Sequence, residues 1–275
     1  MSYGPKPWLQ RHWDVRAATN FTLGGTGAGL LVATALATVA APGWKPALAV
    51  GLALIAAGLG AVWLEIGRKL RAVHVFFNPW TSWMTRESFA ALVVFALGAL
   101  ALALGHPSIA QADGIAALFF VYCQGRILHA SKGIPAWRTA GITPLIMATG
   151  LAEGSGLYML LTAGGGETRA PLLLFVLAIV ARAFAWRGYR ANLGKGAPLR
   201  ALEPSAKWLL NVGTLAPLVV LLLGYFVAPQ FAPAAVMLAA AAALVTGWHF
   251  KFTLVTRAAF NQGFALPRLP VRGGR

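Results

Sequence analysis

The sequence predicts an all-α, polytopic integral membrane protein with eight transmembrane helices and both termini in the cytoplasm. Three observations lead to this prediction: an apolar composition, a series of long apolar runs, and an alternation of charge between the connections. Of the 275 residues, 58% are hydrophobic and only 11% are charged, and the mean hydropathy is +0.69. A soluble domain carries roughly 25% charged residues, so this chain has too few of them to cover a surface that faces water.

The apolar runs define the expected helices. Each run is close to the length of about 20 residues that crosses about 30 Å of hydrocarbon as an α-helix. In chain order, the expected spans are 17–40, 46–67, 88–105, 110–128, 140–163, 170–189, 206–227 and 232–256. They form a single membrane domain, residues 1–275, with short tails of residues 1–16 and 257–275. No cleavable signal peptide is expected, because the first tail is polar and the apolar run after it is too long.

Basic residues concentrate in every second connection, which predicts the orientation. The N-terminal segment contains Lys6, Arg11 and Arg16, and the C-terminal tail contains Arg257, Arg268, Arg272 and Arg275. The second loop contains Arg68, Lys69, Arg71 and Arg86, and the fourth contains Arg126, Lys132 and Arg138. The sixth loop contains Arg187, Arg190, Lys195, Arg200 and Lys207. The other connections are short and hold only Lys45, His106, Asp113, Glu167 and Arg169. By the positive-inside rule, both termini and the even loops lie in the cytoplasm of a bacterial inner membrane.

The same distribution explains the net charge of +16, from 23 Lys and Arg against 7 Asp and Glu. In a soluble protein such a charge would indicate a nucleic-acid partner. Here the cations lie in loops and tails, so we expect membrane lipid as a partner and no nucleic acid.

Two glycine patterns lie inside the spans. Residues 24–29 read GGTGAG, similar to a dinucleotide-binding fingerprint, but position 30 is Leu30 and no strand precedes the segment. The spacings Gly25–Gly29 and Gly150–Gly154 are G-x-x-x-G, which lets two helices pack closely in a membrane. We therefore expect helix packing here and no cofactor site.

Polar side chains inside spans are costly in a bilayer, so each indicates a partner or a function. Glu65 lies near the cytoplasmic end of the second span, with Arg68 at i+3 on the same helix face. Glu153 and Arg182 lie on neighbouring spans at depths that differ by only about 3 Å. They predict a structural ion pair, with proton transfer as the alternative. Other embedded hydrogen-bonding groups lie in the cytoplasmic halves of their spans: Asn20, Tyr122, Asn211 and His249.

Few residues could hold a redox cofactor. The single cysteine, Cys123, excludes a disulfide framework and a self-contained iron–sulfur cluster, which needs about four ligands. Of five histidines only His249 lies clearly within a span, so no haem held by two histidines is expected, and no metal site. There is no P-loop and no nucleophile–base set. The chain is expected to have no catalytic residues of its own.

One segment of the second loop has an unusual composition. Phe76 to Glu87 reads FFNPWTSWMTRE, with Trp80 and Trp83 suited to the headgroup level of a bilayer. Asn78 and Pro79 turn the chain. From these residues alone, an interfacial anchor and a functional segment are both consistent with the pattern.

Several motifs resemble a known family. EIGRKLRA (residues 65–72) followed by SWMTRE (residues 82–87) is similar to the H-L-G-R-P-x-R-A…S-W-L-S-R-E pattern of the dimethyl sulfoxide reductase membrane-anchor family, which is related to the NrfD-like polysulfide reductase anchors. YCQGRILHASKGIPAWR (residues 122–138) resembles the block after the fourth span of that family. WDVRAATNF, NPWTSWMTRE and GIPAWR look most like the anchor subunits of phenylacetyl-CoA:acceptor oxidoreductases, a group that the sequence does not separate from a sulfite-oxidising branch.

The resemblance implies an anchor subunit of a molybdopterin oxidoreductase complex of the kind used in anaerobic respiration. Such an anchor passes electrons between membrane quinone, menaquinone or ubiquinone, and a four-cluster iron–sulfur subunit. The iron–sulfur clusters and molybdopterin would belong only to partner subunits, which we expect on the cytoplasmic side.

Two departures from the family pattern affect the expected site. Glu65 stands where many relatives have a histidine implicated at the quinone site, and Lys69 replaces a proline. A buried carboxyl can accept a proton as an imidazole does, but it cannot act as a neutral imidazole donor. The charge bias also places the Trp-rich loop inside the cell, whereas the bacterial dimethyl sulfoxide reductase anchor presents it outward. Catalytic partner subunits on the cytoplasmic side would suit a substrate found inside the cell, such as a CoA thioester or internally generated sulfite.

The expected site follows from these residues. In this hypothesis quinone enters laterally among the first four spans, near the cytoplasmic face. The quinone and proton site would consist of Glu65, Arg68, Arg86, Glu87, Tyr122, His249 and Asn20. The partner-docking surface would consist of Trp80, Trp83, Arg71, Lys132 and Arg138.

Two other functions remain open at this point. A secondary transporter could use Glu153 and Arg182 as a gated ion site, although transporters usually show internal repeats and broken helices. A purely structural anchor would have no quinone chemistry.

Overall fold

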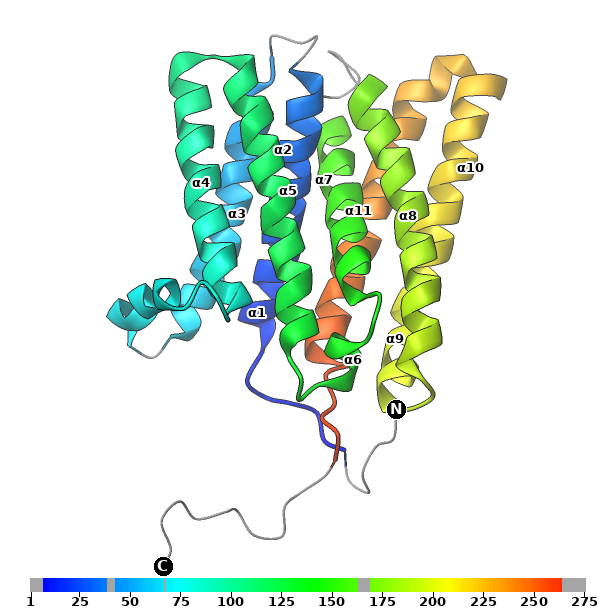
Figure 1. The fold of residues 1–275 in the computed structure, drawn as a ribbon. Coiled ribbons are helices and arrows are strands. Elements are labelled where there is room, and N and C mark those ends of the chain that lie inside the picture. Colours follow the sequence, from blue (N-terminus) through cyan, green and yellow to red (C-terminus); the bar gives the residue numbers. More distant parts are fainter. Residues whose placement is uncertain (1–6, 39–42, 67, 163–168, 264–275) are drawn as a thin grey trace, which may run out of the picture.

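The computed structural model describes residues 7–38, 43–66, 68–162 and 169–263, and within them every regular element is helical. The long helices run side by side as one bundle (Figure 1). Seven helical stretches are long and apolar enough to cross a membrane: Val15–Ala37, Lys45–Glu65, Trp83–Leu104, Ile142–Thr162, Arg169–Leu193, Ala197–Val227 and Pro229–Thr256. The chain is therefore a multi-pass membrane protein.

These stretches contain the labelled elements. The first is α1 (Val15–Thr19), η1 (Asn20–Gly24) and α2 (Gly25–Ala37), followed by α3 (Lys45–Glu65), α4 (Trp83–Leu104), α7 (Ile142–Thr162) and α8 (Arg169–Leu193). The last two are α9 (Ala197–Leu210), η3 (Asn211–Leu215), α10 (Ala216–Leu222) and η4 (Leu223–Val227), then η5 (Pro229–Phe231) and α11 (Ala232–Thr256). Short helices η2 (Lys69–Phe77) and α6 (Pro135–Arg138) lie in connections.

The expected fourth span corresponds to α5 (Pro107–Ala130), which is as long as its neighbours but less apolar. Asp113 and Gln124 lie on it and are fully buried. Because α5 packs against α2, α4 and α7, these polar groups face protein and not lipid. In Figure 1 it lies next to α4, and its lower end extends beyond that helix.

The expected boundaries differ most at the seventh span. It was expected to begin at residue 206, but α9 already begins at Ala197. Pro204 is the eighth residue of this helix, and its missing N–H removes one hydrogen bond of the helix ladder. The extra turns carry the charged residues Arg200 and Glu203, so hydropathy alone placed the start of the span too late.

The glycine pairs pack the centre of the bundle, as the sequence predicts. A Cβ atom on Gly29 of α2 would collide with the backbone of Gly150 on α7, and one on Gly154 would collide with the backbone at Gly29. Helices α2 and α7 therefore meet backbone to backbone. Close contact of this kind replaces the hydrophobic drive that is missing between helices in lipid.

Both ends of the described chain lie at one end of the bundle, the lower end in Figure 1. Leu9 and Phe260 form an isolated antiparallel bridge. The Gln10 amide donates to the carbonyl of Ala259 at 3.0 Å, and the Asn261 amide donates to that of Trp8 at 3.0 Å. Helices η2 and α6 lie at the same end, which we call the loop-rich end.

Candidate functional site

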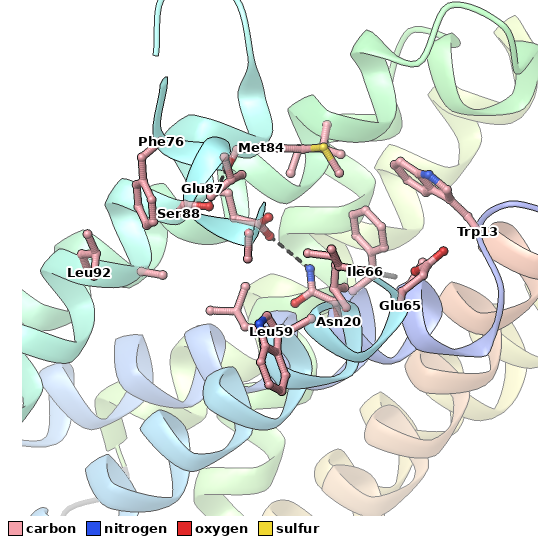
Figure 2. A pocket seen from close by; sticks show the side chains of 18 of the residues that line it. Trp13, Asn20, Leu59, Glu65, Ile66, Phe76, Met84, Glu87, Ser88 and Leu92 are labelled. Carbon is pink, nitrogen blue, oxygen red and sulfur yellow. Dashed lines mark hydrogen bonds between the residues drawn. The ribbon is translucent and has the colours of Figure 1, made fainter. Parts of the chain in front are cut away.

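A cavity of about 320 Å³ opens at the loop-rich end, between the first helix, the last turn of α3, η2 and the first turns of α4. Most of its walls are apolar, and Figure 2 shows the side chains that line it. The lining residues are Trp13, Ala17, Asn20, Phe21, Leu59, Val62, Trp63, Glu65, Ile66, Ala72, Val75, Phe76, Met84, Glu87, Ser88, Ala91, Leu92, Phe95 and Ile127. This volume lies at the lower end of the range for small-molecule sites.

Two polar side chains meet inside the cavity. The Nδ2 of Asn20 donates to Oε1 of Glu87 at 3.3 Å, and the two residues are only 5% and 6% exposed. Figure 2 shows them facing each other. The Oδ1 of Asn20 is buried without a hydrogen-bond partner among the described residues. A carboxyl and an amide in an apolar wall can together bind a carbonyl oxygen and exchange a proton with it.

Local structure places both of these groups. The Ser82 hydroxyl caps α4 by accepting from the Thr85 amide at 3.3 Å, which starts the helix so that Glu87 lies one turn in and faces the bundle. Asn20 begins the π-helical turn η1. Gly58 of α3 lets this turn approach, because a Cβ there would lie 3.1 Å from Asn20 Oδ1. π-helical turns occur frequently at functional sites.

Glu65 is the last residue of α3 and is partly exposed at the cavity. The end of α3 is tied to the N-terminal segment, because Arg16 donates to the carbonyl of Leu64 at 3.3 Å. Arg16 also forms an ion pair with Asp14 at 2.8 Å, and its hydrogen bonds hold the pKa of the Asp14 carboxyl below its usual value. Asp14 in turn caps α1.

Of the seven residues expected at the quinone and proton site, the cavity brings together Asn20, Glu65 and Glu87. The other four do not line it. Arg68 is exposed in the loop before η2. His249 lies on the exposed side of α11 beside Trp208, with 5.7 Å between ring centroids.

Arg86 and Tyr122 belong to a separate cluster around Trp83. Arg86 donates to the carbonyls of Pro79 and Trp80, and its guanidinium lies 4.1 Å from the Trp83 ring centroid. Arg126 lies 4.5 Å from the same ring and donates to the Tyr122 hydroxyl at 3.3 Å. Arg86 therefore holds the Trp-rich loop in shape. It was expected to bind quinone because sequence shows only that it lies next to Glu87.

Some of the expected docking residues are exposed, and others are engaged in contacts within the protein. Trp80 is 86% exposed, and Arg71 and Lys132 are also exposed at the loop-rich end. Arg138 donates to the carbonyl of Lys132 at 2.8 Å. Trp83 is engaged by the two arginines described above, so it contributes less free surface.

The expected Glu153–Arg182 ion pair is not formed, and Glu153 has another partner. Oε2 of Glu153 lies 2.5 Å from Nζ of Lys251 on α11, and both side chains are fully buried. The same carboxylate oxygen accepts from the Thr26 hydroxyl at 2.8 Å. Lys251 also donates to the carbonyl of Phe21 at 2.8 Å. The residues share a depth, but α11 and α2 are the helices that face Glu153.

Arg182 bonds to backbone and hydroxyl groups instead of a carboxylate. It donates to the carbonyl of Ala243 at 3.2 Å, to that of Gly213 and to the Thr214 hydroxyl at 3.3 Å. Gly213 and Thr214 belong to the π-helical turn η3. Carbonyls of two π-helical turns, η1 and η3, thus accept hydrogen bonds from the two buried cations.

Sequence reasoning missed Lys251 and Gln124, which both lie inside expected spans. A lysine within an apolar run is itself a signal of function or pairing. The positive-inside rule concerns lysines and arginines in the connections between spans, so it gives no information about Lys251. Gln124 donates to the backbone carbonyl of Asn20 at 3.1 Å, and its Oε1 is buried without a partner among the described residues.

Comparisons with known proteins add no assignment. No protein-family model matches the chain, and a search of curated proteins finds no significant match. Within the described residues, no group of three or more His, Cys, Asp or Glu side chains could hold a metal ion. The cavity and its surroundings are therefore the features that indicate a function.

Proposed function

We propose that this protein is the quinone-reactive anchor subunit of a molybdopterin and iron–sulfur oxidoreductase complex of the dimethyl sulfoxide reductase type. It would transfer electrons between membrane quinone and a four-cluster iron–sulfur subunit, in a complex of the phenylacetyl-CoA:acceptor or sulfite-oxidising kind. The observation that supports this most is the apolar cavity with the buried Asn20–Glu87 pair and Glu65 among its lining residues.

The cavity suits the chemistry of a quinone. Its apolar lining, which includes Phe76, Leu92 and Phe95, can hold a ring and the start of an isoprenoid tail. Reduction adds two electrons and two protons, one proton to each ring oxygen. Glu87 can deliver a proton to the inner oxygen and Asn20 can donate a hydrogen bond to it. Glu65 is partly exposed and can exchange the second proton with water.

The proposed topology has eight crossings, including α5, with the loop-rich end in the cytoplasm of a bacterial inner membrane. The basic connections all lie at this end, as the positive-inside rule requires. The iron–sulfur subunit and the molybdopterin subunit would dock there, on exposed Arg71, Trp80 and Lys132. The cavity lies at the same end, which keeps the path for electrons short.

Binding of a quinone-site inhibitor tests the proposal directly. The full-length protein in lipid nanodiscs is titrated with a hydroxyquinoline N-oxide, and tryptophan or inhibitor fluorescence reports binding. We expect saturable binding that Glu87→Gln weakens about tenfold, the effect of losing one buried hydrogen bond. Glu203→Gln is the matched control, because Glu203 pairs with Arg190 on the surface, away from the cavity.

The assembled complex gives the second test. Glu87→Gln should abolish quinone-linked activity while the catalytic module still reduces an artificial dye. If the inhibitor does not bind and Glu87→Gln leaves quinone turnover unchanged, the site assignment is wrong and quinone reacts elsewhere in the complex.

A further inference from the structure

The cavity continues into the bundle as a line of buried polar groups. Asn20 contacts Glu87 in the cavity, and Gln124 donates to the backbone carbonyl of Asn20 at 3.1 Å. Beyond Gln124 lies the Lys251–Glu153 pair. Residues from five different parts of the chain, η1, α4, α5, α7 and α11, thus meet along one line.

Glycines keep this line open. A Cβ on Gly24 would lie 2.7 Å from Nε2 of Gln124 and 3.2 Å from Oδ1 of Asn20. A Cβ on Gly25 would lie 2.8 Å from Nζ of Lys251 and 3.2 Å from Oε1 of Gln124. Oε1 of Gln124 and Nζ of Lys251 therefore both lie beside the Cα of Gly25 and close to one another. We infer that a water molecule joins them.

Several acceptors on the line are not satisfied. Oδ1 of Asn20, Oε1 of Gln124 and Oε1 of Glu153 are all buried with no hydrogen-bond partner among the described residues. A network with a purely structural role is expected to satisfy its buried polar atoms, because each unpaired one is costly. Proton transfer through water requires hydrogen-bond acceptors that follow one another along the path, as these three do.

At the end of the polar line that lies deepest in the bundle, the buried charges allow one proton to be released. Glu153 carries one negative charge, while Lys251 and Arg182 carry two positive charges, and all three side chains are fully buried. Both cations act electrostatically on the Glu153 carboxylate. An arginine does not lose its proton in proteins, whereas a buried lysine can. If Lys251 releases a proton, Glu153 and Arg182 remain as a balanced pair of charges.

We propose that Lys251 is a proton store for the quinone site, connected to Glu87 through Gln124 and Asn20. The inference rests on the proposed quinone chemistry. When the quinone has accepted two electrons from the iron–sulfur partner, Glu87 gives its proton to the inner ring oxygen and becomes a carboxylate. The Lys251 ammonium then reprotonates Glu87 through the line and becomes a neutral amine. The outer oxygen takes its proton from the medium at Glu65, and Lys251 later recovers a proton from the medium.

The test measures quinol formation and proton uptake together. The full chain in nanodiscs is loaded with decylubiquinone, which a photoexcited one-electron donor reduces while a pH dye follows the medium. In the wild-type protein we expect proton uptake to lag behind quinol formation by two protons per protein over the first two quinols, one from Glu87 and one from Lys251. In Lys251→Arg, which keeps the charge but cannot release the proton, the lag should fall to the one proton of Glu87, and formation of the second quinol should slow at least about tenfold.

A second variant keeps the test decisive if Arg does not fit at position 251. Gly25→Ala places a methyl group between Gln124 and Lys251 and should have the same effect, since both neighbouring atoms are at the ends of flexible side chains. Gly60→Ala is the matched control, because a Cβ there meets nothing within 4 Å. Inhibitor affinity should stay within about twofold in all three variants.

The outcomes separate the two proposals. A wild-type lag of no more than one proton per protein, or a two-proton lag that persists in both Lys251→Arg and Gly25→Ala, overturns the proton store while inhibitor binding still supports the quinone site. A wild-type protein that binds neither inhibitor nor decylubiquinone overturns the quinone site, and the proton store with it.

Discussion

The Glu153 carboxylate and the Lys251 ammonium lie 2.5 Å apart in the interior of the bundle, and neither side chain has any exposed surface. The pair joins α7 to α11, and hydrogen bonds from Lys251 to the carbonyls of Phe21 and Thr22 join both helices to η1. A buried ion pair of this kind contributes little net stability over apolar residues of the same shape, but breaking it is expensive.

Removing one partner of this pair should therefore destabilise the protein. Lys251→Met leaves the Glu153 carboxylate buried without its cation, and we expect a loss of about 3–5 kcal/mol in the free energy of unfolding. The double variant Lys251→Met/Glu153→Gln should recover much of that loss, because both charges of the pair are removed together. Thermal unfolding in detergent measures both. Equal stability of the single variant and the wild type would contradict the pairing.

The backbone contact between α2 and α7 should not tolerate a side chain. In Gly154→Val, the added atoms collide with the backbone of Gly29 and Leu30. Overpacking typically costs about 1–3 kcal/mol, and a clash with backbone lies at or above the upper end of that range. Gly188→Ala, where a Cβ meets nothing within 4 Å, serves as the control. The fraction of protein that stays monodisperse in detergent on heating reports the difference. Gly154→Val as stable as the control would mean that the two helices are further apart.

The cap of α4 should affect stability and binding together. Ser82→Ala removes the acceptor for the Thr85 amide, which costs about 1 kcal/mol for a typical N-cap. Because the cap sets the first turn of α4, we also expect weaker binding of a hydroxyquinoline N-oxide at the cavity. For the stability measurement alone, Ser88→Ala is a useful comparison, since its hydroxyl donates to the carbonyl of Met84 in its own helix at 3.0 Å. A larger effect of Ser88→Ala would argue against the cap.

Cysteine labelling can decide the orientation. The natural cysteine, Cys123, is fully buried and should not react with a membrane-impermeant maleimide, so the background is low. Thr81→Cys adds an exposed thiol in the Trp-rich loop, and Ser108→Cys adds one at the opposite end of the bundle. With the loop-rich end in the cytoplasm, intact cells should label only Ser108→Cys and inverted vesicles only Thr81→Cys. The reverse pattern would contradict the proposed side for the partner subunits.

The long helices could be predicted from the sequence because their signal is local. A run of apolar residues has to satisfy its backbone hydrogen bonds within itself in lipid, so length and composition identify a spanning helix. The same holds for the glycine pair at Gly25 and Gly29, whose spacing fits close packing. The prediction was weaker where burial in protein allows polar residues, as at Asp113 and Gln124 of α5.

The candidate site could be predicted only in part, for a related reason. Glu65, Glu87 and Asn20 were expected at one site and line one cavity, since each lies where its helix reaches the loop-rich end of the bundle. Arg86 lies next to Glu87 in sequence, but adjacent helix positions point in directions about 100° apart. Arg86 therefore faces the Trp83 ring while Glu87 faces the cavity.

What the sequence determined by itself was the depth of each residue along its own helix, because a fixed rise per residue converts position into distance. Depth placed Glu153 and Arg182 at one level, and the structure gives each of them a different partner. Only the tertiary structure decided which helices face each other, and thus that Lys251 and not Arg182 contacts Glu153. That choice depends on contacts between residues far apart in the chain, and no local pattern in the sequence contains it.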